Sequence, residues 1–272
     1  METIWNCAQS ILGLRIIRRW RSCVFMRPTQ NGTSSLAEDT SVETRALEEK
    51  FQGLIQASTY PCLGAKAALH SRAYVFQLYD RLAEAKSTRR LAADLEQFQY
   101  SKLRRDSNFA SFVAAFRFPV SPHETEFERL LWSQLIKLSQ RDLSRHRWDP
   151  KVSSDPADPF YSFSFAGSAL YIVGLHPRSS RLARRFVLPT LVFNPHEQFE
   201  RLRAEGKWER MKESIRNREV ALQGNVNPML GDFGVSSEAR QYSGRTVPTN
   251  WHAPFEETSP NGTHGKRCPF GH

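Results

Sequence analysis

The chain has 272 residues, of which 40% are hydrophobic and 24% charged, an ordinary composition for a globular protein. This length suffices for one large domain with a full hydrophobic core or for two small ones. No run of about 18 apolar residues is present, so no membrane-spanning helix is expected. The formal net charge of +10 suits either a polyanion or a small anionic ligand.

Part of this charge is concentrated at the amino end. Residues 1–28 contain five arginines and one glutamate around an apolar run. The arginines follow the apolar run, the reverse of a secretory signal, which leaves three interpretations: a non-functional extension, a membrane-surface helix or an organelle presequence. We expect residues 1–41 to be a disordered basic extension and linker, and residues 256–272 to be a disordered tail.

The four cysteines contain no Cys-x-x-Cys pair; they are Cys7, Cys23, Cys62 and Cys268. Neither a structural zinc site nor a disulfide framework is therefore expected. This usage is typical of a reducing compartment and indicates a cytoplasmic protein, with organelle import or membrane-surface association as the alternative.

Residues 42–255 are expected to form one domain. Apolar residues at helical spacing predict helices over 43–57 and 65–85, and a weaker third one over 88–100. Alternating aromatic and small residues predict a strand over 109–118. A cap-like Ser121-Pro122 pair then opens another amphipathic helix.

The second half of this region predicts a small sheet. Two strands, 160–166 and 169–175, are joined at Gly167-Ser168, and a third covers 185–194. A helix then runs from 194 to about 222, and most of the remainder is loop. Adjacent strands flanked by helices indicate an α+β fold with a small antiparallel sheet.

Two histidines stand at the ends of predicted elements. His176 ends an apolar strand and is followed by Pro177, which favours projection into a cleft. His196 falls in the first turn of a helix, where the helix dipole favours a neutral ring. Either imidazole could ligate a metal or act as a base. Each could equally be a structural histidine at a sheet edge or helix cap.

Charged residues cluster around these histidines. Four arginines lie within 178–185, and Arg240 lies in a later loop. They could clamp a carboxylate or phosphate, or form a solvated basic face. The nearby acids that could hold a cation are Asp155, Asp158, Asp232 and Glu238. No phosphate-binding loop, dinucleotide fingerprint or nucleophile elbow is present.

Several ordered motifs resemble the YqcI/YcgG family over about residues 45–255. The matching segments are Tyr60-Pro-Cys-Leu-Gly-Ala-Lys66, Ser153-Ser-Asp-Pro156, Phe163-Ser-Phe165, Gly174-Leu-His-Pro-Arg-Ser-Ser-Arg181, Phe193-Asn-Pro-His-Glu-Gln-Phe-Glu200, Asn227-Pro-Met-Leu230, Asp232-Phe-Gly234 and Ser237-Glu-Ala-Arg-Gln-Tyr-Ser-Gly-Arg245. One departure is Ala253, which stands where the family pattern has a cysteine.

The resemblance implies a haem-dependent oxygenase that N-hydroxylates a guanidine nitrogen of arginine or of a related small molecule. It implies haem b with an axial histidine, for which His176 is the first candidate and His196 the second. The Cys62 thiolate is the third. Arginines would pair with the haem propionates, the candidates being Arg178, Arg181, Arg184, Arg185 and Arg240. A carboxylate would hold the substrate, the candidates being Asp155, Asp232 and Glu238.

This activity also implies partners. Dioxygen would be the oxidant, with electrons from a reductase or ferredoxin-like protein, and hydrogen peroxide is the alternative source. A nucleic-acid partner is not expected, because the arginines cluster around histidines and no nucleic-acid motif is present. The alternatives are a haem carrier or sensor without turnover, and a basic protein that binds a polyanion without catalysis.

Overall fold

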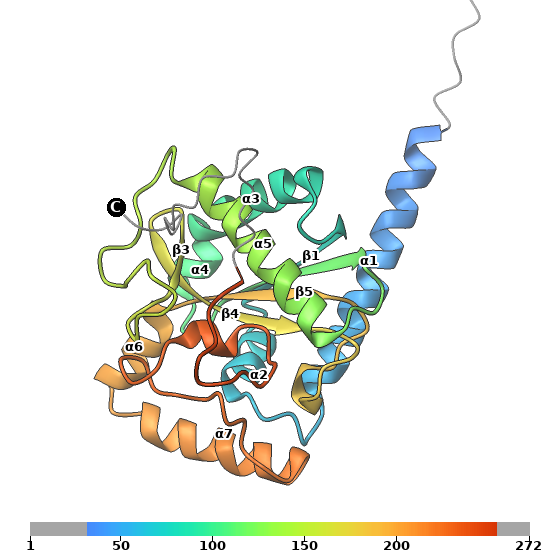
Figure 1. The fold of residues 1–272 in the computed structure, drawn as a ribbon. Coiled ribbons are helices and arrows are strands. Elements are labelled where there is room, and N and C mark those ends of the chain that lie inside the picture. The colour runs from blue at the N-terminus through green and yellow to red at the C-terminus, as the bar shows by residue number, and fades with distance from the viewer. Residues whose placement is uncertain (1–31, 255–272) are drawn as a thin grey trace, which may run out of the picture. The chain divides into compact units, whose positions relative to one another are not determined.

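The computed structural model describes residues 32–254, with side chains from Thr40 onward (Figure 1). Residue contacts divide the chain into residues 1–40 and residues 41–272, and the domain described here belongs to the second unit. The expectations for residues 1–31 and for the tail, with Cys7, Cys23 and Cys268, lie outside the described residues.

The helices in the described region are α1 Gly32–Gln56, α2 Leu63–His70, α3 Ala85–Gln99, α4 Lys102–Asp106, α5 Glu124–Asp142, α6 Glu197–Ala204 and α7 Trp208–Gln223. The strands are β1 Tyr74–Arg81, β2 Ser111–Phe118, β3 Phe163–Phe165, β4 Ser168–Leu175 and β5 Thr190–Pro195. Two short 3-10 helices are η1 Leu182–Arg184 and η2 Glu238–Gln241. None of the described helices is long and apolar enough to cross a membrane.

The five strands form one mixed sheet in the order β1-β2-β5-β4-β3. The pair β1 and β2 is parallel, and the chain between them crosses over through α3. The other pairs are antiparallel, with β4 and β5 in register from Leu170 opposite Pro195 to Leu175 opposite Thr190. The α+β class is confirmed, and one parallel pair adds to the expected antiparallel sheet.

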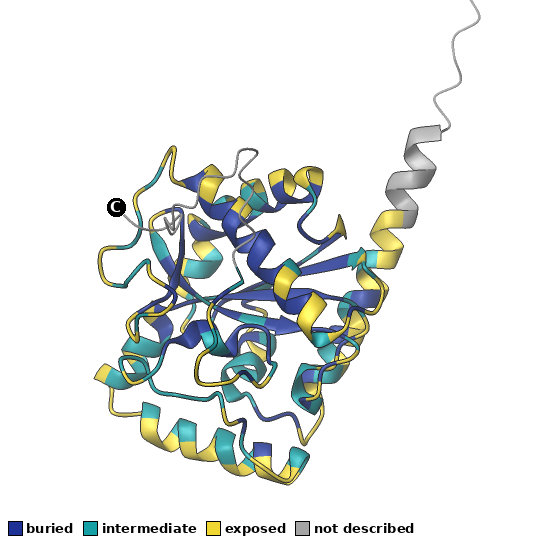
Figure 2. Ribbon diagram, in the orientation of Figure 1, coloured by how far each residue is buried: buried dark blue, intermediate teal, exposed yellow. Residues whose placement is uncertain are grey.

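Alternating side chains give the sheet two separate cores. The α5-side core joins Phe112, Ala114 and Phe116 of β2 with apolar residues of α3 and α5. The α1-side core joins Val113 and Ala115 with apolar residues of α1. Figure 2 shows the strands and the inner face of α5 as buried, whereas α7 is mostly exposed or half-buried. The helices on the two sides of the sheet therefore differ in how deeply they are buried.

Most predicted elements are confirmed, and three differ. Residues 74–81, expected to continue a helix, form β1 instead, because the chain leaves α2 through Arg72 at a φ of 55° and pairs with β2. The helix expected from 194 to 222 is broken at Gly206, which has a φ of 66°. Helix α1 begins at Gly32, within the segment expected to be a linker.

Candidate functional site

A cavity of about 260 Å³ lies on the α1 side of the sheet. Tyr171 and Val173 of β4, with Val192 of β5, form part of its wall. Helices α1, α2, α6 and α7, η1, η2 and the segment 227–233 supply most of the rest, and most of the lining residues are apolar. This composition is typical of a small-molecule site, in which a few polar groups set specificity.

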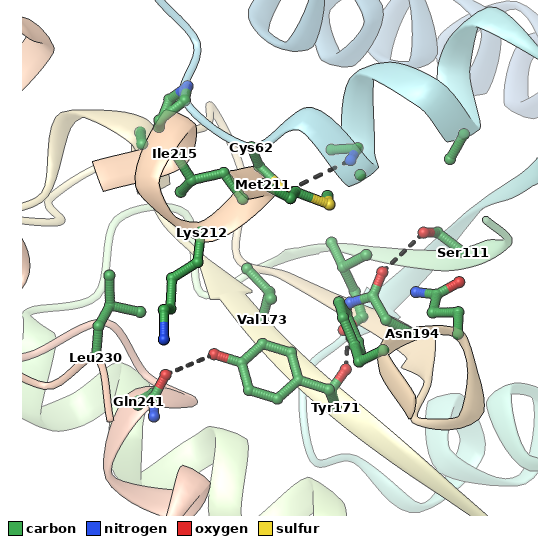
Figure 3. Close-up of a pocket in the computed structure, with 18 of the residues that line it drawn as sticks. Cys62, Ser111, Tyr171, Val173, Asn194, Met211, Lys212, Ile215, Leu230 and Gln241 are labelled. Carbon is green, nitrogen blue, oxygen red and sulfur yellow. Dashed lines mark hydrogen bonds between the residues drawn. The ribbon is translucent and has the colours of Figure 1, made fainter. Parts of the chain in front are cut away.

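Cys62 lines this cavity at the start of α2. It is the N-cap residue, and its sulfur accepts a hydrogen bond of 3.4 Å from the Ala65 N–H (Figure 3). Burial raises the pKa of the Cys62 thiol, while the N–H groups of Ala65 and Gly64 and the charge of Arg184 act in the opposite direction. The sulfur is therefore a buried thiol whose surroundings already contain groups that stabilise a thiolate.

Glu238 of η2 contributes a buried carboxyl group to the same cavity. Tyr242 and Ser162 each donate a hydrogen bond of 2.7 Å to its Oε1 atom. Burial is the main reason that its pKa rises to about 8, against these two donors and Arg203, which lower it. Glu238 is therefore mostly protonated at neutral pH in the ligand-free cavity, and a cation could replace that proton.

His196 lies between Glu238 and the protein surface. Its Nε2 atom is 3.8 Å from Glu238 Oε2, and its Nδ1 atom is 3.7 Å from Glu200 Oε1. The ring centroid is 4.7 Å from that of Phe233. Burial, with Arg203, lowers the pKa of His196 to about 4. The expected neutral imidazole is thus supported, with burial as the principal cause.

Tyr171 and Gln241 connect two walls of the cavity. The Tyr171 hydroxyl donates a hydrogen bond of 2.8 Å to Gln241 Oε1, shown as a dashed line in Figure 3. The Gln241 amide donates in turn to the Gly231 carbonyl at 3.3 Å. Tyr171 alternates with Val173 and Leu175 along β4, which places the three side chains on one face of the strand.

His176 does not line the cavity. It is fully buried, and its ring stacks on Phe127 of α5 with a centroid distance of 4.5 Å. Alternation along β4 explains this placement, because Leu170 and Ile172 also belong to the α5-side core. Burial lowers the pKa of His176 to about 4. The structure therefore separates the first candidate ligand from the cavity and places the second and third candidates in it.

Four of the predicted arginines also lie elsewhere. Arg178 is exposed and contacts His123, and Arg185 donates to the Ser179 carbonyl. Arg181 is buried in an ion pair with Glu219, and Arg240 donates to carbonyl groups of 247–249. The basic residues that line the cavity are Arg184, Arg203, Lys212 and Arg216.

The predicted acids divide in the same way. Glu238 and Asp232 line the cavity, and Asp232 pairs with Lys212 at 3.0 Å. Asp155 is exposed and accepts a hydrogen bond from the Ala157 N–H, so its role is to stabilise a turn. Asp158 likewise accepts a hydrogen bond from the Phe160 N–H. Only Glu238, among these acids, is buried without a basic side chain as hydrogen-bond partner within the described residues.

The fold and the cavity define an α+β protein with a largely apolar cavity on one face of its sheet. The chain belongs to the YqcI/YcgG family, whose model matches residues 51–256. The resemblance inferred from the motifs is thereby confirmed, and the matched region includes Cys62, His196 and Glu238. No curated protein and no solved structure matched the chain.

Proposed function

We propose that this protein is a haem-dependent oxygenase that N-hydroxylates a guanidine nitrogen of arginine or of an arginine-derived small molecule. The observation that carries the proposal is the joint placement of Cys62 and Glu238 in one apolar cavity. A soft sulfur ligand with N–H donors suits haem iron, and a buried carboxyl group suits a guanidinium ion. The family resemblance supports haem-dependent N-hydroxylation but implies a histidine ligand, so the choice of Cys62 rests on the cavity lining alone.

Cys62 is the residue we assign to the iron of haem b. A bound haem would supply the activation of dioxygen, and Cys62 would be the residue that holds it. The Ala65 N–H would hold the thiolate in position, as hydrogen bonds around a metal ligand do generally. His196 is a weaker candidate, because its two ring nitrogens face Glu238 and Glu200. His176 would need access from the cavity, which it does not line.

The basic residues of the cavity would pair with the haem propionates. We assign this role to Arg184, Arg203 and Arg216, in place of the arginines outside the cavity. The volume of about 260 Å³ is slightly below the range of ligand pockets, roughly 300–1,000 Å³. Haem binding would therefore require a wall to move. Helices α6 and α7 suit this movement, since Gln198 and Glu219 are their only buried residues.

Glu238 is the residue we assign to the substrate. On binding a guanidinium ion, it would give up its proton and pair with the planar cation through two oxygens. Tyr242 and Ser162 would keep the carboxylate oriented through Oε1. One oxygen atom of dioxygen would enter the substrate and the other would leave as water. The electrons would come from a reductase or ferredoxin-like partner. The free thiol of Cys62 is consistent with a cytoplasmic location.

Haem reconstitution tests the proposal. The wild-type protein should bind haem and show the red-shifted ferrous–carbon monoxide absorbance of thiolate ligation, and Cys62→Ser should lose that signature. Cys62→Ser changes a single atom, so a retained circular dichroism spectrum would separate ligand loss from unfolding. If the wild-type protein binds no haem, the proposal is wrong. If Cys62→Ser keeps the wild-type spectrum, the ligand assignment is wrong.

Turnover separates an enzyme from a carrier. With a reducing system, arginine should gain one oxygen atom by mass spectrometry, and Glu238→Gln should reduce this product strongly. Haem binding without any product from arginine or related guanidines would favour the carrier or sensor alternative. Salt-sensitive binding of a polyanion by a haem-free protein would favour the non-catalytic alternative.

A further inference from the structure

Besides the cavity that it lines, the buried carboxyl group of Glu238 faces a row of side chains that leads to the protein surface. Both groups that donate to its Oε1, Tyr242 and Ser162, are fully buried, so neither leads outward. The other carboxyl oxygen, Oε2, faces His196 Nε2 at 3.8 Å. The imidazole then faces Glu200 through Nδ1 at 3.7 Å.

The side chains of this row are buried at the Glu238 end and exposed at the Glu200 end. The side chains of Glu238 and His196 are 6% and 4% exposed, whereas that of Glu200 is 41% exposed. We propose that Glu200, His196 and Glu238 form a proton relay between solvent and the cavity. Glu238 touches the substrate in the proposed function, and His196 and Glu200 act through it. The use of the relay in catalysis rests on the proposed function. Proton transfer along the relay can be tested in the protein without haem.

The distances in the relay suit intermittent proton transfer. Each gap is about 1 Å longer than a hydrogen bond, so a small side-chain rotation brings donor and acceptor into contact. The backbone N–H of His196 donates to the Ala169 carbonyl at 2.9 Å, which anchors the residue while its ring moves. Glu200 lies one turn further along α6 and reaches the opposite nitrogen of the ring.

The charge states of the three groups also suit a relay. A neutral imidazole can accept a proton at one nitrogen and release another from the second, whereas a permanently charged one cannot. Burial and Arg203 favour the neutral form of His196, and Asp149 favours the charged form. The carboxyl groups of Glu200 and Glu238 also face the ring. Around Glu238, the polar and charged neighbours are Tyr242, Ser162, Tyr171, Arg203 and His196. The ring of His196 is therefore held in the form that can take up a proton at one nitrogen and release one from the other.

The relay has two uses in the proposed reaction. When a guanidinium ion binds, the proton that leaves Glu238 can pass outward through His196 to Glu200. During turnover, reduction of dioxygen consumes protons, and the same row can carry them inward.

A pH-jump experiment on the full chain without haem tests this inference. Infrared spectroscopy can follow the protonated carboxyl band of Glu238, assigned by its loss in Glu238→Gln. After the jump, the band should respond more slowly in Glu200→Gln and His196→Gln by about tenfold or more. Glu200→Asp should restore part of the wild-type rate. The matched control is Glu197→Gln, an exposed acid on the same helix that pairs with Arg104 and should leave the rate unchanged.

The outcomes separate the relay from the proposed function. A wild-type rate in Glu200→Gln would overturn the relay, as would the absence of a protonated Glu238 band that responds to the jump. Either result would leave the haem spectrum and arginine hydroxylation of the wild-type protein as independent tests of the function. A disturbed fold in His196→Gln would not remove the test, because Glu200 is only at the exposed end of the relay.

Discussion

The Gly174 N–H donates a hydrogen bond of 2.7 Å to the carbonyl oxygen of Tyr242, which joins β4 to the segment after η2. A Cβ atom on Gly174 would lie 2.7 Å from this oxygen and 2.7 Å from a ring carbon of Phe127. A side chain at this position would therefore push Tyr242 away from the sheet, and Tyr242 is one of the two donors that orient Glu238.

Gly174→Ala should lower the free energy of unfolding by about 3 kcal/mol, because overpacking a close contact forces the backbone apart. Chemical denaturation monitored by tryptophan fluorescence would measure this change. Gly53→Ala in α1 is the control, since its Cβ would contact nothing within 4 Å. It should be neutral or stabilise the protein by up to about 1 kcal/mol. Equal effects of the two substitutions would contradict the packing explanation.

The pair of Glu128 and Arg245 should contribute more to stability than an exposed pair. Arg245 contacts the carboxylate of buried Glu128 at 2.5 Å. Arg245→Leu would leave a buried charge without its partner and should cost about 3 kcal/mol. Arg145→Leu, which removes an exposed partner of Glu96, should cost less than about 1 kcal/mol. Thermal denaturation of both variants gives the comparison, and a smaller loss for Arg245→Leu would refute the ranking.

Glu238 should make the protein less stable as the pH rises from about 5 to about 8. Its pKa is raised to about 8 in the fold, so in this range the folded state holds a proton that the unfolded state has lost. The stabilisation is complete below the unfolded pKa and disappears as the pH passes the folded one. Glu238→Gln should remove this contribution, changing the slope by about 1.4 kcal/mol per pH unit at most.

His176 and His196 should make the protein more stable as the pH rises, which is opposite to the effect of Glu238. The pKa values of His176 and His196 are lowered to about 4, so their contribution is present above about pH 6.5 and is lost on acidification. Denaturation midpoints of the wild type and Glu238→Gln between pH 5 and 8 isolate the contribution of Glu238, because both proteins keep the two histidines. Parallel curves for the two proteins would show that Glu238 ionises normally in the fold.

Helix α7 should be held on the domain mainly by the ion pair of Arg181 and Glu219. Arg181 donates to Glu219 at 2.9 Å, and Gln223 bonds to the same segment of chain. Glu219→Gln would leave the buried guanidinium without a charged partner, so α7 should open more often. Hydrogen exchange of α7 amides should accelerate by about tenfold or more. Glu209→Gln on the exposed face of α7 should change it little. Exchange rates that match in the two variants would contradict this role of the ion pair.

Local sequence signals predicted β2, α5 and the hairpin of β3 and β4. Strict alternation in β2 and a tight turn after β3 are local features. The structure forms both, with the two turn residues at Ala166-Gly167, one position before the expected Gly167-Ser168. Strand β1 could not be found in this way. Its apolar residues continue the helical spacing of α2, and it becomes a strand because it pairs with β2 across the α3 crossover. That pairing lies far along the chain and leaves no local signal.

The candidate site was predicted in part. The alternation along β4 and β5 places His176 and His196 on opposite faces of the sheet, and this could be inferred from sequence. Which face carries a cavity depends on how α1, α2 and α7 dock, and these contacts are tertiary. For the same reason, the sequence could not show which arginines line the cavity. Arg203 of α6 does so, whereas Arg178, Arg181 and Arg185 do not.

The two faces of the sheet place different limits on how related chains can diverge. Large side chains such as Trp132 and Phe127 are fully buried in the α5-side core, so substitutions there disturb the fold. The helices α6 and α7 across the cavity bury almost nothing, so their inward side chains can change in size and charge while the sheet stays intact. Substitutions in these two helices can therefore alter the size and charge of the cavity of this chain while its sheet is kept.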